Sequence, residues 1–212
     1  MTNEVTVKDR RGRLLDHSKR VYSIIVGLAI ADACRTLFPF DFSHGLSNSL
    51  VLFLTFVVTV VPIYQGFDRS LDIKYYETAL DAPLNPGAYT WDVAMLLVTA
   101  IFFVGMAESL RTNGTPTPAA FYFWLGLMLV FDCGVLLIDY AKSPVKETLR
   151  PHYRIWGAIN LALGIVAIYA SFGVAAQEAV GPATGAQWLF LLLAVVRSGI
   201  DYSRSMRFLF PQ

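Results

Sequence analysis

Among the charged side chains in the apolar stretches of the sequence, six are singled out because water should be scarce around them. They are Asp32, Arg35, Asp132, Asp139, Arg197 and Asp201. If these stretches cross a bilayer, a charge at the centre of a span costs about 2.5–3.5 kcal/mol on insertion scales. Such groups therefore normally face the interior of a helix bundle, where they pair with one another and mark pathways for ions, protons or polar solutes.

Spacing along the chain predicts which of these charges can pair within one helix. Asp32 and Arg35 are three residues apart and Arg197 and Asp201 are four apart, so each pair shares a helix face. Asp132 has no basic residue at such a spacing. It is therefore expected to be protonated, or to meet Arg197 or Arg35 across the bundle.

Two interpretations of these charges remain open from the sequence. In the first, Asp32, Asp132, Arg197 and Asp201 line a polar path or a solute site. In the second, the same side chains form ion pairs that only fix how the helices pack. Both interpretations place the charges facing inward, so residue type and spacing do not separate them.

A second charged cluster follows Pro62, where the apolar stretch continues as PIYQGFDRSLDIKYYET. Together with one residue near the C-terminus, its members are Asp68, Arg69, Asp72, Tyr75 and Arg204. At helical spacing they would line a charged cytoplasmic vestibule, suited to an anionic ligand, a gate or a partner protein. The simpler alternative is a solvated helix extension with local salt bridges. Pro62 itself is expected to free a backbone carbonyl that the bundle or water must satisfy.

The elements that position these residues are predicted to be transmembrane helices. The chain has 212 residues, of which 55% are hydrophobic and only 16% charged, and its mean hydropathy is +0.51. Crossing the hydrocarbon core takes roughly 20 mostly apolar residues in a helix. Six stretches qualify, at 19–39, 48–66, 90–109, 119–140, 155–175 and 186–206. The predicted fold is therefore an all-α, polytopic bundle of about six transmembrane helices.

The positions of lysine and arginine predict how this bundle is oriented. With the N-terminus inside, fourteen of the 17 basic residues fall on the cytoplasmic side, and the reverse topology would place them outside. We therefore expect both termini in the cytoplasm of a multi-pass protein of the plasma membrane, which in bacteria is the inner membrane. The predicted parts are a basic cytoplasmic segment at 1–18, a membrane domain at 19–206 with a cytoplasmic loop at 67–89, and a tail at 207–212.

Three further features of the sequence are weaker. Residues 4–15 (EVTVKDRRGRLL) could form a small strand–turn–strand, although a flexible basic tail against anionic lipid is the simpler interpretation. IYQGF at 63–67 resembles IYASF at 168–172, which hints at a three-plus-three inverted repeat, but such echoes also arise by chance in apolar helices. Gly27 and Ala31 have the spacing that allows close helix approach.

Several classes of function lack a signature. The three histidines lie outside the predicted spans, and HExxH, Walker and GxSxG motifs are absent, so we expect no metal site, no cofactor and no enzymatic activity. The basic residues next to the spans reflect topology rather than nucleic-acid binding. The leading hypothesis is a small membrane protein, within the lipid bilayer and in a homo-oligomer, that transports or gates a small solute or ion. The alternative is a membrane-embedded sensor or scaffold that recruits a cytoplasmic protein.

Overall fold

The computed structural model describes residues 2–35, 48–77, 85–111, 117–142, 146–174 and 184–209, and these residues contain helices and no strands. The α-helices are α1 (Thr2–Arg35), α2 (Asn48–Asp72), α3 (Pro86–Arg111), α4 (Pro118–Lys142), α5 (Lys146–Val174) and α6 (Gly185–Leu209). A π-helical turn, η1 (Ile73–Glu77), extends α2. Each predicted apolar stretch falls on one of these helices. Residues 36–39 and 175, at the ends of two predicted spans, lie outside the described residues.

Local signals explain where several helices begin. Pro86 and Pro118 are the first residues of α3 and α4, a position that needs no backbone N–H. The Asn85 side chain accepts hydrogen bonds from the backbone N–H groups of Gly87 and Ala88, and so caps α3. At the start of α6, the Thr184 N–H donates to the Gln187 side chain at 2.8 Å, the return bond of a capping box.

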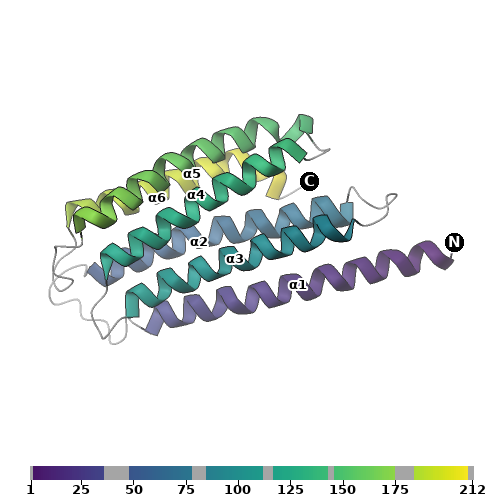
Figure 1. Ribbon diagram of the computed structural model, residues 1–212, viewed down its shortest axis with the longest axis horizontal. Coiled ribbons are helices and arrows are strands. Elements are labelled where there is room, and N and C mark those ends of the chain that lie inside the picture. Colours follow the sequence, from purple (N-terminus) through teal and green to yellow (C-terminus); the bar gives the residue numbers. More distant parts are fainter. Residues whose placement is uncertain are drawn as a thin grey trace.

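The helices run roughly along the long axis of the molecule, and both termini lie at one end of the bundle (Figure 1). We call this the terminal end. The most extensive packing is between α4 and α5, followed by the pairs α2–α6, α1–α3 and α3–α4. The counterpart of α4–α5 in a three-plus-three repeat would be α1–α2, which is a minor contact. The packing of the described helices therefore does not reproduce the internal repeat that the sequence hinted at.

Glycines set the closeness of the α4–α5 pair. A Cβ atom on Gly126 would lie 2.8 Å from the Gly164 carbonyl oxygen and 2.5 Å from the Ile168 side chain. Gly27 faces open space instead, with nothing within 4 Å of where its Cβ would be. The close approach predicted for Gly27 and Ala31 is therefore not made between the described helices, whereas Gly126 and Gly164 make one that the spacing of small residues had not indicated.

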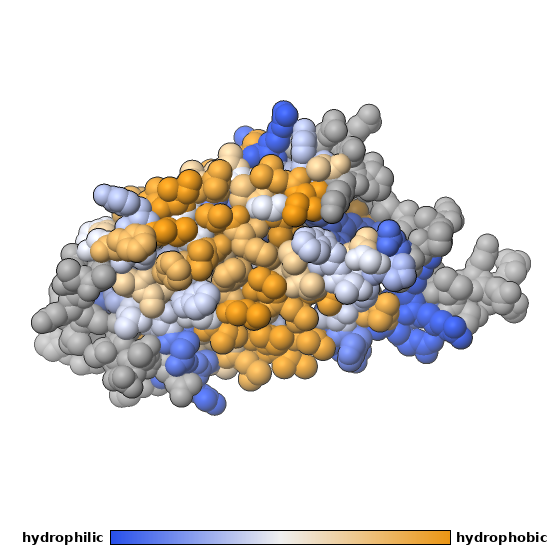
Figure 2. Space-filling model, viewed as in Figure 1, coloured by the Kyte–Doolittle hydropathy of each residue, from blue (hydrophilic) through white to orange (hydrophobic). Residues whose placement is uncertain are grey.

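Within the part of the chain that the structure describes, four helices are long and apolar enough to cross a membrane, namely those within Asn48–Tyr75, Pro86–Leu110, Pro118–Ala141 and Tyr153–Gly173. At most half of each apolar window is buried inside the bundle, and only 28% for the α5 segment. The rest of the apolar surface faces outward, as a lipid-facing protein requires. In Figure 2 these side chains form a band across the middle of the visible face, with hydrophilic side chains toward the two ends.

The two other helices fall short of this criterion because of their charges. The described part of α1 ends at Arg35 and carries Lys19, Arg20 and Asp32 within its second half. Helix α6 has an apolar first half but contains Arg197 and Asp201. The described part of the chain has the six α-helices that the sequence predicted. For four of them, length and composition also support the prediction that they cross the membrane.

The N-terminal segment differs from its prediction. Residues 4–15 form neither a strand–turn–strand nor a loose tail, because α1 is one continuous helix from Thr2. Tertiary contacts of residues 14–18 stabilise the helix there, despite the weak alternating pattern of the sequence. Leu15 is buried, the Tyr89 hydroxyl donates to the Leu14 carbonyl at 3.0 Å, and the hydroxyls of Ser18 and Tyr89 are 2.7 Å apart. Beyond these contacts α1 projects past the other helices (Figure 1).

Candidate functional site

A hydrogen-bonded chain of three buried polar residues crosses the interior from α4 to α6. The Asn160 amide of α5 donates to a carboxylate oxygen of Asp132 on α4 and accepts a bond of 2.7 Å from Nε of Arg197 on α6. The three residues are only 2–8% exposed. The amide thus links the acid to the base, and the predicted meeting of Asp132 with Arg197 across the bundle takes place through Asn160.

This chain borders a cavity rather than a sealed core. The cavity has a volume of about 80 Å³ and lies between α2, α4, α5 and α6. Asp132, Asn160 and Arg197 form its deep end, and the side chains of Phe67, Leu136 and Trp156 are among its apolar walls. Asp139 and Asp201, both partly exposed, line it closer to the terminal end. Charged groups therefore meet a space large enough for small molecules, within a mostly apolar bundle.

The α2 side of the cavity is shaped by Pro62. A proline lacks the N–H that would bond the carbonyl four residues earlier, which here belongs to Val58. Ser198 of α6 supplies the missing donor, because its hydroxyl lies 2.8 Å from the Val58 carbonyl oxygen. One turn further on, the Tyr202 hydroxyl donates to the Gln65 side chain. These bonds hold α6 against α2 close to the level of Arg197. The Ser198 bond also satisfies the carbonyl that Pro62 frees, as was expected of the bundle.

A lysine-centred network lies beside the cavity near the terminal end. Lys74 of η1 pairs with Asp139 of α4 at 2.8 Å and with Asp92 of α3 at 3.1 Å. The Tyr75 hydroxyl donates to Asp92 at 2.7 Å. Because Asp139 lines the cavity, this network joins its mouth to α2 and α3. Tyr75, predicted to line the mouth, does not line the cavity and instead binds Asp92 within this network.

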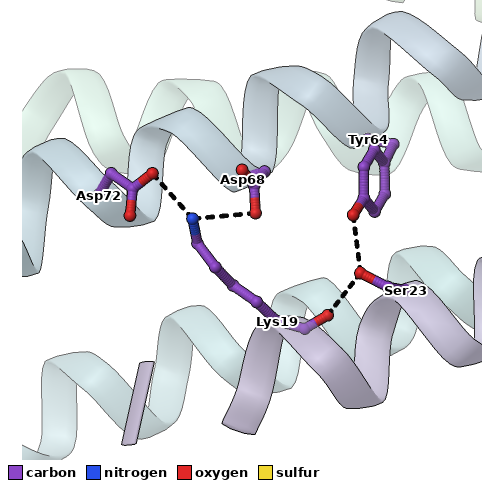
Figure 3. Close-up of polar contacts among 5 residues, drawn as sticks. All are labelled: Lys19, Ser23, Tyr64, Asp68 and Asp72. Atoms are coloured by element: carbon purple, nitrogen blue, oxygen red, sulfur yellow. Dashed lines mark hydrogen bonds and ion pairs between the residues drawn. The ribbon is translucent and has the colours of Figure 1, made fainter. Parts of the chain in front are cut away.

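Two other members of the predicted mouth cluster face a different way. Asp68 and Asp72 of α2 both pair with Lys19 of α1, at 3.0 and 2.8 Å, and neither lines the cavity (Figure 3). The Ser23 hydroxyl, which donates to the Lys19 carbonyl, lies 2.7 Å from the Tyr64 hydroxyl in the same seam. The salt bridges are therefore between helices, not local to α2, and they fix α1 against α2.

The remaining predicted residues are also placed. Asp32 is half-buried and Arg35 is exposed near the far end of α1, and neither lines the cavity that holds Asp132 and Arg197. Arg69 is half-buried on α2, outside the cavity lining, and Arg204 is exposed near the end of α6. Of the predicted path, the structure brings together Asp132, Arg197 and Asp201 and leaves Asp32 apart.

Three residues of the site were missed in the sequence. Asn160 is the only amide in the apolar run AINLALGIV, and that isolation was a usable signal. Lys74 lies in the predicted cytoplasmic loop and Asp92 near the start of the predicted span at 90–109, and neither was singled out. Their roles depend on which helices are neighbours, and spacing within one helix carries no information on that point.

Within the described ranges, no group of three or more histidine, cysteine or acidic side chains is arranged to hold a metal ion. The chain matches no protein-family model, no curated protein and no solved structure. What the site does must therefore be inferred from its own geometry.

Proposed function

We propose that this chain is an integral membrane protein in which all six helices cross the bilayer, with both termini on the cytoplasmic side. The ends of α1 and α6 support this, since both termini lie at one end of the bundle (Figure 1), and basic residues are frequent in the sequence near these ends. Both helices also present apolar side chains outward, among them Ile24 and Leu28 of α1 and Leu192 and Val195 of α6. Arg197 and Asp201 of α6 line the cavity, where they are sheltered from lipid.

Within that membrane, the proposed function is to transport or gate a small solute or ion through the cavity between α2, α4, α5 and α6. The observation that carries the proposal is that Asp132 and Arg197 border an open space, linked by an amide. Ion pairs that serve packing alone are best sealed and fully satisfied, because an incompletely paired buried charge is destabilising. A site for a mobile polar species needs the opposite, namely charged groups that a solute can reach.

The helix contacts support movement around this site. Helices α5 and α6 follow one another in sequence but share few contacts, whereas α4–α5 and α2–α6 are extensive pairs. The cavity therefore lies between two packed pairs whose direct junction is loose, and a small shift of one pair against the other would widen it. The Lys74–Asp139 bond at the mouth is suited to act as a gate, since it ties α4 to the extension of α2.

Flux into liposomes tests the proposal. Purified protein is reconstituted into liposomes, and uptake of radiolabelled small carboxylates, methylammonium, halides and alkali cations is measured in turn against protein-free liposomes. We expect flux of at least one class in the wild type, its loss in Asp132→Asn, and its retention in Asp32→Asn, which alters a charge away from the cavity. The proposal fails if no class is moved, or if Asp132→Asn carries wild-type flux.

The sensor or scaffold alternative has one observation in its favour. Helix α1 projects from the terminal end with exposed charged side chains, including Arg10, Arg13 and Arg20 (Figure 1). If a soluble partner binds this surface and Arg204, charge reversal of Arg10 and Arg204 should abolish its binding and leave flux unaffected. In either case a homo-oligomer would cover part of the outward apolar face of α5, where Tyr169 and Phe172 are 81% and 73% exposed.

A further inference from the structure

Arg197 is buried with part of its guanidinium unsatisfied. Its Nε donates to Asn160, but Nη1 has no hydrogen-bond partner among the described residues, although the side chain is only 8% exposed. A buried N–H without an acceptor is costly, and more so when it carries charge. Arg197 also lines the cavity, so the cavity is the side from which an acceptor can approach the guanidinium, once a small shift opens Nη1 to it.

The cavity limits what that acceptor can be. Its volume of about 80 Å³ compares with roughly 30 Å³ for a water molecule in the liquid, so it holds a few waters or a ligand of a few heavy atoms. A guanidinium presents a planar fork of donors that fits the two oxygens of a carboxylate. The apolar walls formed by Phe67, Leu136 and Trp156 suit a short hydrocarbon tail better than a fully hydrated ion.

Charge balance adds a second condition. The same cavity is lined by Asp132, Asp139 and Asp201, and the Lys74 ammonium is bonded to Asp139. An anion at Arg197 would place another negative charge close to Asp132, in a medium where like charges repel strongly. A proton on Asp132 removes that repulsion, so anion binding and protonation favour one another.

The titratable and charged groups around Asp132 come from several helices. They are Arg197 and Asp201 on α6, Asp139 and Cys133 on α4, Tyr153 on α5, Lys74 on η1, and Tyr22 on α1. Asp132 itself is buried, and it is hydrogen-bonded to Asn160, the residue that also accepts a hydrogen bond from Arg197. It is therefore the group whose proton the anion at Arg197 controls most directly.

We propose that the cavity binds a small monocarboxylate together with one proton, the carboxylate at Arg197 and the proton on Asp132. This inference rests on the proposed function, of which it names the solute class and the coupling ion. No bond is made or broken apart from the transfer of the proton from solvent to the Asp132 carboxylate. The bound pair adds no net charge to the site, which is what permits its passage through an apolar bundle.

Calorimetric titration of the purified, detergent-solubilised full chain with acetate, in two buffers of different ionisation enthalpy, counts the protons taken up per anion bound. At pH 8 we expect close to one proton per acetate in the wild type and in Asp32→Asn. Acetate affinity should rise by about tenfold for each unit by which the pH falls, as linkage to one proton requires. In Asp132→Asn we expect acetate still to bind, with no proton uptake.

Arg197 is tested with the conservative variant Arg197→Lys, since Arg197→Gln risks misfolding. Arg197→Lys keeps the charge but loses the fork, and we expect acetate affinity to fall at least tenfold while helix content stays that of the wild type. Acetate binding to the wild type without proton uptake, or unchanged affinity in folded Arg197→Lys, would overturn the inference.

The liposome measurement separates this inference from the function on which it rests. If liposomes show flux of cations while acetate does not bind, the carboxylate site is wrong and the proposed function stands. If acetate binds with proton uptake but no solute crosses the liposome membrane, the proposed transport function is wrong and the carboxylate site stands.

Discussion

The hydroxyl of Ser198 donates to the carbonyl of Val58 at 2.8 Å, and that carbonyl is the one Pro62 leaves without its helical donor. A serine on α6 thus repairs a defect that a proline creates on α2. The repair lies next to Arg197 in sequence and next to the cavity in space. Pro62 lines the cavity, and the Ser198 hydroxyl satisfies the carbonyl that this proline leaves free.

The first prediction concerns this repair. Ser198→Ala should lower the free energy of unfolding by about 1 kcal/mol, because a buried carbonyl loses its donor from α6. Pro62→Ala returns an N–H to the helix, so adding it to Ser198→Ala should recover the loss. Titration with a denaturing detergent, followed by circular dichroism, measures all four members of the cycle. Equal losses from Ser198→Ala with and without Pro62 would show that the bond does not compensate for the proline.

The second prediction concerns the contact between α4 and α5. Gly126→Ala would put a Cβ 2.5–2.8 Å from Ile168 and the Gly164 carbonyl, so the helices must separate. We expect a loss of about 1–3 kcal/mol in the free energy of unfolding, as for overpacked cores. Gly27→Ala, the matched control, meets nothing within 4 Å and should be neutral or slightly stabilising, since alanine favours helix over glycine. Equal melting temperatures of the two variants would contradict the packing described.

The third prediction concerns topology. In a chain whose cysteines Cys34 and Cys133 are replaced by alanine, single cysteines are introduced at Arg10, Arg204 and Glu108, three exposed positions. An impermeant thiol reagent applied to intact cells should label only the Glu108→Cys chain, and the other two only after lysis. That pattern follows if all six helices cross the bilayer and the termini lie inside. Labelling of Arg204→Cys in intact cells would show that α6 does not complete the sixth crossing.

Much of the fold follows from the sequence, because hydropathy and turn residues act locally. The six helices coincide with six apolar stretches, and Pro86, Pro118 and Asn85 mark helix starts by chemistry that any sequence displays. The N-terminal helix was the exception, since what holds residues 14–18 is their contact with Tyr89, more than 70 residues away.

Only the buried charged residues of the site could be predicted from the sequence. Asp132 and Arg197 could be found because burying a charge in an apolar stretch demands a partner. Which partner depends on how each helix is rotated and which helices are neighbours. Asp68 and Asp72 therefore turned out to face Lys19 instead of the cavity, and Asn160 entered as the link that charge counting could not show.

The central claim, that solute passes through the cavity between α2, α4, α5 and α6, is tested most directly by blocking it. Leu136 lines this cavity, whereas its neighbour Leu137 is 57% exposed on the outside of the bundle. In the chain without native cysteines, a small charged thiol reagent should abolish most flux through Leu136→Cys and leave flux through Leu137→Cys unchanged. Undiminished flux through Leu136→Cys, once its thiol is shown by mass spectrometry to be modified, would contradict the account.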